Sequence, residues 1–192
     1  FANQKGGVGK TTSTINVAAA FALKLTWLNP DNPDRVLVVD MDSQCNTVVT
    51  FSTGVFGTRD FEVPQYALED YLLQRTAAPL LEAIVTSEIP TNANHNLDFI
   101  FSTRSGMKQV EKEFSRQRLV EDSYIAAGED LEFLAGNASV ADGGQDDVIY
   151  RLADLLDEVA GQYVAIFIDT GPKDSLLTTA AFAAATHIIV PL

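Results

Sequence analysis

Residues 5–12 read Lys5-Gly6-Gly7-Val8-Gly9-Lys10-Thr11-Thr12. Glycines allow backbone N–H groups to converge on a polyphosphate without obstruction by Cβ atoms. The apolar residues that follow predict a helix over residues 10–25, and its positive N-terminal end would face the same anion. The stretch therefore predicts a phosphate-binding loop between a strand and a helix, with Lys10 reaching the β- and γ-phosphates and the Thr11 hydroxyl ligating Mg²⁺.

Two apolar runs further along the chain each end in an aspartate. Residues 36–39 are followed by Asp40 and Asp42, and residues 163–168 are followed by Asp169. Continuous apolar runs are typical of parallel strands that are buried on both faces. Ligands of open parallel sheets bind beyond the carboxyl ends of the strands, so we expect these aspartates near the phosphates. The alternative for the first two is that they cap a strand end in a turn.

The order of strand and helix patterns predicts an α/β fold, with a mostly parallel sheet and helices on both faces. We expect further helices over residues 65–75, 79–86, 107–122, 145–159 and 176–185, strands over 97–101 and 187–190, and a loop over 51–64. The length of 192 residues suits one domain. Because the chain begins with Phe1 directly before the loop, we expect it to be an internal fragment that lacks the first strand and the C-terminal part of its domain.

Composition excludes several classes of protein. The chain has 26 acidic and 13 basic side chains, so its net charge of −13 excludes a uniformly basic nucleic-acid coat, although not a local basic patch. The single cysteine, Cys45, excludes an intramolecular disulfide framework and a cysteine-rich zinc site. Residues 175–192 lack charged side chains, but a short helix followed by a strand fits them better than a membrane span.

Residues 3–12 resemble the deviant Walker A box of the ParA/MinD family of P-loop ATPases, and Gln4 favours the ParA (Soj-like) partition branch. The resemblance implies a three-layer P-loop NTPase fold in which residues 5–12 bind the nucleotide. It also implies that Lys5 is the signature lysine, which reaches the partner's phosphates in a nucleotide-sandwich dimer. A cation supplied in trans would neutralise charge that develops on the transferred phosphoryl group. The alternative for Lys5 is a solvated loop lysine.

Residues 40–46 resemble the second box of that family, Asp-x-Asp-Pro-Gln-x-Asn, with Ser43 in place of the proline. The resemblance implies that Asp42 orients or deprotonates the attacking water, and that Asp40 supports the metal or its waters. Asp169 resembles the Walker B aspartate, which holds a Mg²⁺-bound water, and Gly171 replaces a proline that often follows it. The lone cysteine argues against an iron–sulfur reductase of the related nitrogenase type.

The function that the resemblance implies is a ParA-like ATPase that binds Mg·ATP, forms a homodimer in the ATP state and hydrolyses ATP slowly. It implies a ParB-like activator, non-specific DNA binding through regions mostly outside this chain, and a cytoplasmic, nucleoid-associated location for partition or cargo positioning. Three alternatives remain open: a MinD-like membrane-associated ATPase, a DNA-binding scaffold that does not turn ATP over, and a metabolic P-loop enzyme that transfers phosphate to a small substrate.

Five basic residues lie within 15 positions, in and just before the predicted helix over residues 107–122. They are Arg104, Lys108, Lys112, Arg116 and Arg118. The first four are spaced by four residues, so most of them share one helix face. This face could contact DNA phosphates or a partner. The alternative is a solvated face on which Glu111 and Glu113 supply counter-charges.

Overall fold

The structure is a computed structural model that describes Ala2 and residues 6–29, 34–53, 62–87, 96–127, 145–172 and 175–191. Within these residues the strands form one sheet in the order β2-β3-β1-β4. Strands β1 (Val36–Met41), β3 (Leu97–Ile100) and β4 (Ala165–Thr170) are parallel, and β2 (Ile84–Thr86) runs antiparallel to β3. The prediction of a mostly parallel sheet is therefore confirmed.

Strand β1 is the centre of the core. All six of its residues are buried, as expected for a strand that lies between two others, and its first four residues are the apolar run. Its first residue, Val36, lies opposite Leu97 of β3 and Ala165 of β4. The register with β4 continues to the other end, where Asp40 lies opposite Asp169.

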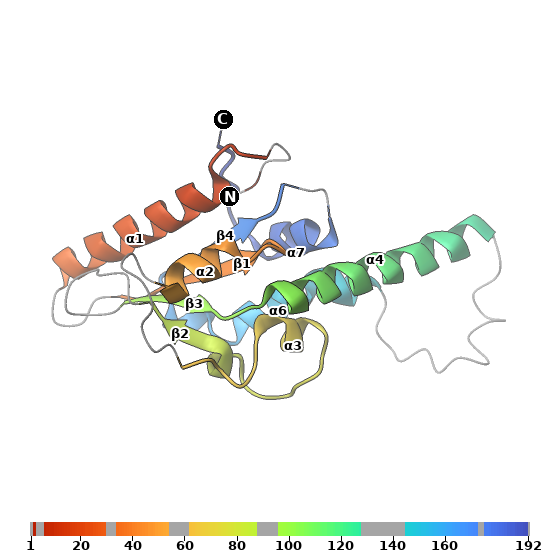
Figure 1. Cartoon of the computed structure of the whole chain (residues 1–192), viewed down its shortest axis with the longest axis horizontal. Coiled ribbons are helices and arrows are strands. Elements are labelled where there is room, and N and C mark those ends of the chain that lie inside the picture. The colour runs from red at the N-terminus through yellow and green to blue at the C-terminus, as the bar shows by residue number, and fades with distance from the viewer. Residues whose placement is uncertain are drawn as a thin grey trace.

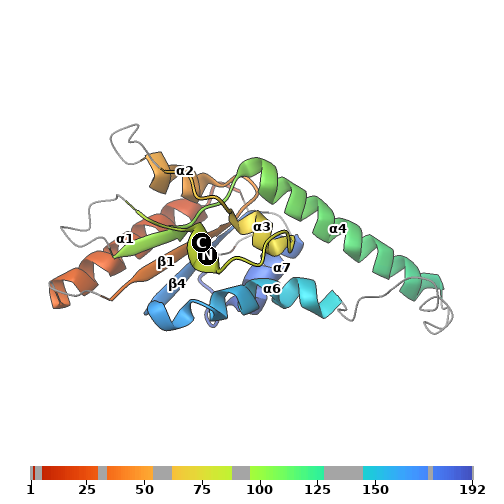
Figure 2. The same ribbon diagram turned by 90° about the horizontal axis from the view of Figure 1, so that it is seen from below.

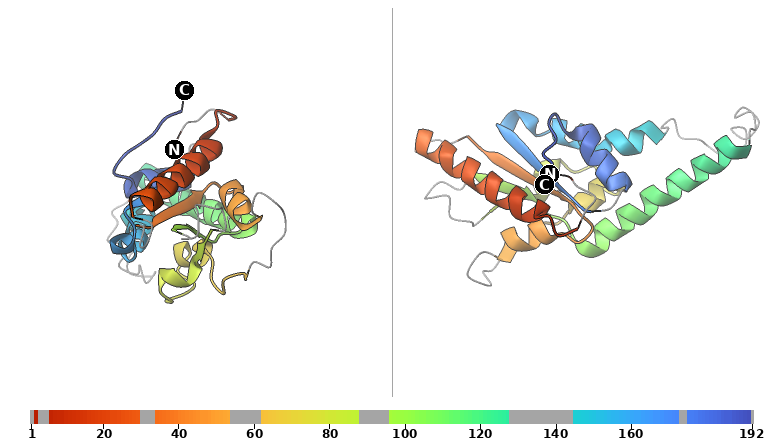
Figure 3. Two further views of the ribbon diagram at one scale, coloured as in Figure 1. Left: turned by 90° about the vertical axis from the view of Figure 1, so that its left-hand side faces the viewer. Right: turned by 90° about the horizontal axis from the view of Figure 1, so that it is seen from above.

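Helices cover both faces of this sheet (Figure 3). One layer holds α1 (Lys10–Leu28) and α2 (Asn46–Thr53), and the other holds α6 (Gln145–Asp157) and α7 (Leu176–Ala184), which pack closely against each other. Two further helices, α3 (Leu68–Leu72) and α4 (Arg104–Ala127), pack against this second layer. The second half of α4 extends well beyond the rest of the described structure (Figures 1 and 2).

The observed bounds of α2 and α3 differ from the predictions. The predicted loop over residues 51–64 begins too early, because α2 continues to Thr53, and its residues 54–61 lie outside the described part. The predicted helix over 65–75 is only the short α3, which begins where the Asp70 carboxylate accepts a hydrogen bond from Ala67 N–H (3.0 Å). Capping of this kind fixes a helix start that apolar spacing alone does not show.

The helix predicted over residues 79–86 is wrong. A 3₁₀ turn, η1 (Leu80–Ala83), leads directly into β2, and a second short turn, η2 (Ala160–Gln162), precedes β4. Two backbone hydrogen bonds join the β2 region to β3: Phe101 N–H donates to Ala83 O (2.8 Å) and Ser87 N–H donates to Leu97 O (2.7 Å). The β-branched residues of β2 therefore complete a sheet edge instead of a helical turn.

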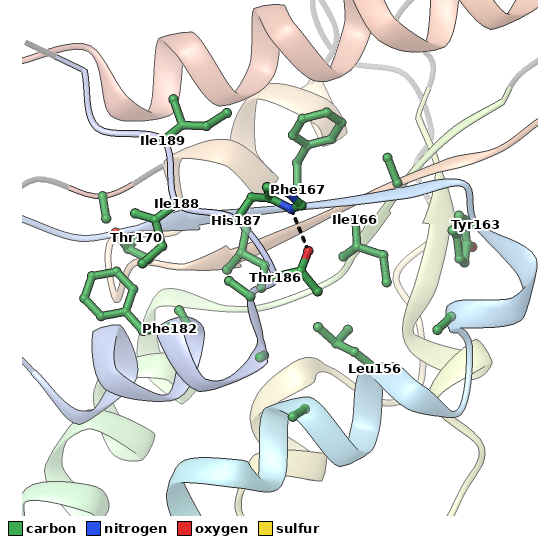
Figure 4. A pocket seen from close by; sticks show the side chains of 18 of the residues that line it. Leu156, Tyr163, Ile166, Phe167, Thr170, Phe182, Thr186, His187, Ile188 and Ile189 are labelled. Carbon is green, nitrogen blue, oxygen red and sulfur yellow. Dashed lines mark hydrogen bonds between the residues drawn. The ribbon is translucent and has the colours of Figure 1, made fainter.

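The strand predicted over residues 187–190 is also wrong, because this segment is irregular in the structure. A cavity of about 580 Å³ separates it from β4, and the side chains of Ile166, Phe182 and Ile188 are among those that line it (Figure 4). A strand requires a paired backbone, and among the described residues this segment is not part of the sheet. The Ile189 carbonyl instead accepts a hydrogen bond from Ala2 N–H (3.0 Å).

Among the residues that the structure describes, none of the helices combines the length and the apolar character that crossing a membrane requires.

Candidate phosphate-binding and carboxylate site

The glycine-rich loop adopts backbone angles that explain its composition. Gly7 has φ of +76° and Gly9 has φ of +80°, in the left-handed region that residues other than glycine rarely adopt. Gly9 is the residue before α1, which begins at Lys10 as predicted. The Lys10 side chain is 7% exposed, so the chain holds it inside the fold instead of in solvent. The signature lysine predicted at position 5 lies outside the described residues.

The carboxylates of Asp40 and Asp169 lie side by side at the carboxyl ends of β1 and β4. They are 1% and 0% exposed, and the sheet register places the two residues directly opposite each other. The first turn of α2 binds the Asp40 carboxylate, because Oδ2 accepts hydrogen bonds from Thr47 N–H (2.9 Å) and Val48 N–H (3.3 Å). A carboxylate at a helix N-terminus is stabilised by these free amides.

Two buried threonines that the sequence analysis did not single out bind the Asp169 carboxylate. Thr47 Oγ1 donates to Asp169 Oδ2 (2.8 Å), and Thr14 Oγ1 lies 3.4 Å from Asp169 Oδ1. Thr14 also donates to the Lys10 carbonyl one turn earlier (3.0 Å). These contacts bring the start of α1 next to both aspartates. The spacing of Thr14 from Lys10, one helical turn, was the signal available in the sequence.

Burial of two neighbouring carboxylates changes their acidity. Desolvation raises the pKa of Asp40 to about 7, and repulsion from Asp169 adds to this effect while the amide hydrogen bonds oppose it. Desolvation also raises the pKa of Asp169, against the hydrogen bonds from Thr11 and Thr47. A cation bound beside the two carboxylates would favour their charged forms and oppose this effect of burial.

Asp42 differs from these two residues because it is only half-buried and lies in a turn after β1. Its N–H donates to Asp40 Oδ1 (3.0 Å), and its own Oδ1 accepts from Gln44 N–H (3.0 Å). The turn closes when Cys45 N–H donates to Asp42 O (2.9 Å), with Cys45 at φ of +50°. The turn capping that was the alternative for these aspartates therefore occurs, and it leaves Asp42 half-buried.

The glycine at position 171 brings the segment after β4 close to Asp42. A Cβ atom at Gly171 would lie 3.1 Å from Asp42 Oδ1 and 3.3 Å from its Cγ, which is tighter than nearly all observed contacts. The structure therefore brings together Lys10, Asp40, Asp42 and Asp169 around the start of α1.

The chemistry of these side chains fits a magnesium ion that arrives with a nucleotide. Mg²⁺ prefers oxygen ligands and is usually bound by one or two carboxylates together with phosphates and waters. Asp40 and Asp169 are the carboxylates that could take this part, and Thr11, which interacts with Asp169, has a hydroxyl beside them. Within the described part of the chain, no group of three or more His, Cys, Asp or Glu side chains is arranged as a metal site by itself.

The basic residues of α4 divide into two groups. Arg104 contacts the turn after Asp42, because its Nε donates to Gln44 O (2.6 Å) and its Nη2 to Asn46 Oδ1 (3.2 Å). Lys108, Lys112 and Arg116 are exposed on the face of α4 opposite its buried apolar residues, and the side chain of Arg118 lies outside the described residues. The predicted common face is therefore present for four of the five.

Comparison with known proteins agrees with this arrangement. The family model described as "AAA domain" matches residues 1–192. The chain is 30% identical to the chromosome partitioning protein ParA of Myxococcus xanthus over 190 residues, which cover 99% of this chain and 50% of that protein. It is 30% identical over 193 residues to ParA of Caulobacter vibrioides, covering 100% of this chain and 54% of that protein. The chain thus spans about half the length of these relatives.

Solved structures show the same fold. Cobyrinic acid a,c-diamide synthase from Mycobacterium smegmatis, solved with a bound ATP analog and magnesium, superposes with a TM-score of 0.64 at 22% identity and covers 100% of this chain and 57% of that one. The three-layer arrangement predicted from the sequence is therefore confirmed, and it is shared with that solved structure. The resemblance seen in the sequence is likewise confirmed, because the relatives that the chain matches are ParA proteins. The chain belongs to the AAA domain family and resembles its ParA branch of P-loop ATPases.

Proposed function

We propose that this chain is the nucleotide-binding part of a ParA-like ATPase, which binds Mg·ATP and hydrolyses it to ADP and phosphate. The observation that carries the proposal is the meeting of Asp40, Asp42 and Asp169 beside the glycine loop at the start of α1. In open parallel sheets this edge is where ligands bind, and the amides of a helix N-terminus favour an anion there. The resemblance to ParA proteins supports the same proposal.

Each residue has a proposed role at this edge. The amides of Gly6, Gly7, Val8 and Gly9 and of residues 10–12 cradle the phosphates, and the Lys10 ammonium reaches the β- and γ-phosphates. Thr11, Asp40 and Asp169 hold the magnesium ion or its waters. That ion, when bound, neutralises charge that develops on the phosphate oxygens.

Asp42 is the proposed group that orients the attacking water or accepts its proton. Its position suits this role because it is half-buried, whereas Asp40 and Asp169 are nearly inaccessible and are occupied by hydrogen bonds from α1 and α2. A general base must be able to approach the water that it activates.

We also propose that residues 1–192 belong to a single P-loop ATPase domain.

The proposal extends to a switch between oligomeric states. Lys5 of the partner subunit contacts the phosphates in a nucleotide-sandwich homodimer, so the γ-phosphate contributes contacts that exist only in the dimer. Hydrolysis removes those contacts and releases the subunits, since a ligand shifts an equilibrium only through its differential affinity for two states. A ParB-like activator, non-specific DNA and a cytoplasmic, nucleoid-associated location complete the proposed partition cycle.

The test of the enzymatic proposal is phosphate release by the full-length protein and its Lys10→Ala variant. We expect slow ATP-dependent release in the wild type and loss of nucleotide binding or turnover in the variant, because the charge facing the phosphates is removed. Near-normal turnover in Lys10→Ala would refute the role of the loop. Stable retention of ATP without release in the wild type would favour a non-hydrolysing scaffold.

The DNA-binding part of the proposal has a separate test at the exposed lysines of α4. The double variant Lys108→Glu, Lys112→Glu should bind DNA more weakly and reduce the slope of log affinity against log salt by about 1 per lysine. Lys24→Glu, at an exposed position on α1, is the matched control for a charge change elsewhere. An unchanged slope would show that these lysines do not contact DNA and form only a solvated helix face.

A further inference from the structure

The proposed function leaves one charged contact near Asp42 without a role, namely the side chain of Arg104. Arg104 is the first residue of α4, and its guanidinium bonds to two oxygens of the turn after Asp42. Nε donates to Gln44 O (2.6 Å) and Nη2 donates to Asn46 Oδ1 (3.2 Å). Arginine suits such a contact because its planar fork can address two acceptors at once in a fixed geometry.

The turn that Arg104 holds is the one that orients the Asp42 carboxylate. Gln44 supplies its carbonyl to Arg104 and its N–H to Asp42 Oδ1 (3.0 Å). Asn46 supplies its side-chain oxygen to Arg104 and is also the first residue of α2. A shift of the Arg104 contact would therefore move the peptide whose amide binds Asp42.

The residue before Arg104, Thr103, is bound by a buried carboxylate from α3, which fixes the start of α4. Glu69 is 5% exposed, and both of its carboxylate oxygens accept from Thr103 N–H (3.2 Å each), while the Thr103 hydroxyl also donates to Oε1. Gly106, in the first turn of α4, leaves room for this carboxylate, since a Cβ there would lie 2.0 Å from Glu69 Oε1. A carboxylate at this end of α4 is also favoured by the helix dipole.

We propose that Arg104 is a positioning residue, which holds the turn of residues 43–46 and through it the Asp42 carboxylate in the orientation that attack of water on the γ-phosphate requires. This inference rests on the proposed ATPase function. Arg104 does not touch the nucleotide in this account. It acts through Gln44 and Asn46, and α3 and α4 supply the fixed point from which it acts.

The first experiment measures amide hydrogen exchange of residues 42–49 in the full-length protein without nucleotide. In Arg104→Ala we expect amide exchange at Gln44 to become about tenfold faster. This factor corresponds to the loss of one hydrogen bond from a charged donor, at the lower end of the usual range of strengths of such bonds. Lys24→Ala, at an exposed position on α1, is the control and should exchange as the wild type does. Equal exchange at Gln44 in all three proteins would overturn the proposal, whether or not the protein hydrolyses ATP.

The second experiment measures kcat and KM for ATP in the same variants. Because the phosphate loop is on another element, Arg104→Ala should lower kcat by about tenfold, as expected for a misplaced reacting group, and leave KM within about twofold. Arg104→Lys should recover part of kcat, since a lysine can reach one of the two oxygens. A wild type without turnover would refute the ATPase proposal and leave the exchange result to decide on Arg104. An active wild type with kcat unchanged in Arg104→Ala would refute the positioning role alone.

Discussion

Replacement of Thr47 by valine tests the buried contact that joins α2 to the end of β4. Thr47 Oγ1 donates to Asp169 Oδ2 at 2.8 Å, and both residues are 0% exposed. Valine has the shape of threonine, so the change opens no cavity and removes only the hydroxyl donor. A buried hydrogen bond to a charged group contributes about 1.5–3 kcal/mol, and we expect Thr47→Val to lower the free energy of unfolding by that amount.

Urea unfolding of the full-length protein, followed by circular dichroism, measures this difference from the shift of the midpoint at constant slope. Thr50→Val is the matched control on the same helix, because Thr50 is exposed and donates only to the Asn46 carbonyl (2.9 Å). Its effect should stay within about 0.5 kcal/mol, as for surface substitutions in general. If the two variants were equally stable, the contact between Thr47 and Asp169 would not hold the site together.

Two further predictions concern the turn after β1. Gly171→Ala should lower kcat for ATP by about tenfold, because its Cβ at 3.1 Å must displace the Asp42 carboxylate by a few tenths of an ångström. Gly161→Ala, where a Cβ would have nothing within 4 Å, is the control, and equal rates in both variants would contradict the reasoning. Burial raises the pKa of the Cys45 thiol to about 12, above the value near 8.5 of an unfolded thiol, so the reactive thiolate stays scarce in the native protein at pH 8–10. Iodoacetamide at pH 9 should therefore label Cys45 much more slowly in native protein than in urea, and similar rates would show that the thiol is accessible and ionised.

The parts of the fold that could be predicted are those with strong local signals. Apolar runs of strand length identified β1, β3 and β4, and the glycine loop identified the first residue of α1. The same runs located Asp40 and Asp169, because parallel strands end at one edge of a sheet. Their register, which places these two residues opposite each other, required the structure.

The missed parts depend on contacts between segments that are distant in sequence. Residues 84–86 became a strand because β3 supplied a paired backbone, whereas residues 187–190 have no such partner strand among the described residues. Thr47 and Arg104 entered the site through contacts that span 122 and 60 residues of chain. Such pairs leave no pattern in one sequence, since a threonine or an arginine is ordinary at either position of a helix.

The molar mass of the full-length Asp42→Ala protein in solution, with Mg·ATP and then with Mg·ADP, tests the central proposal most directly. Removal of the carboxylate that activates water should leave ATP binding intact, so the ATP state accumulates and can be weighed. We predict a dimer with Mg·ATP and a monomer with Mg·ADP, because only the γ-phosphate supplies the contacts that join two subunits. The same mass with both nucleotides would contradict the sandwich switch and leave only a nucleotide-binding P-loop protein.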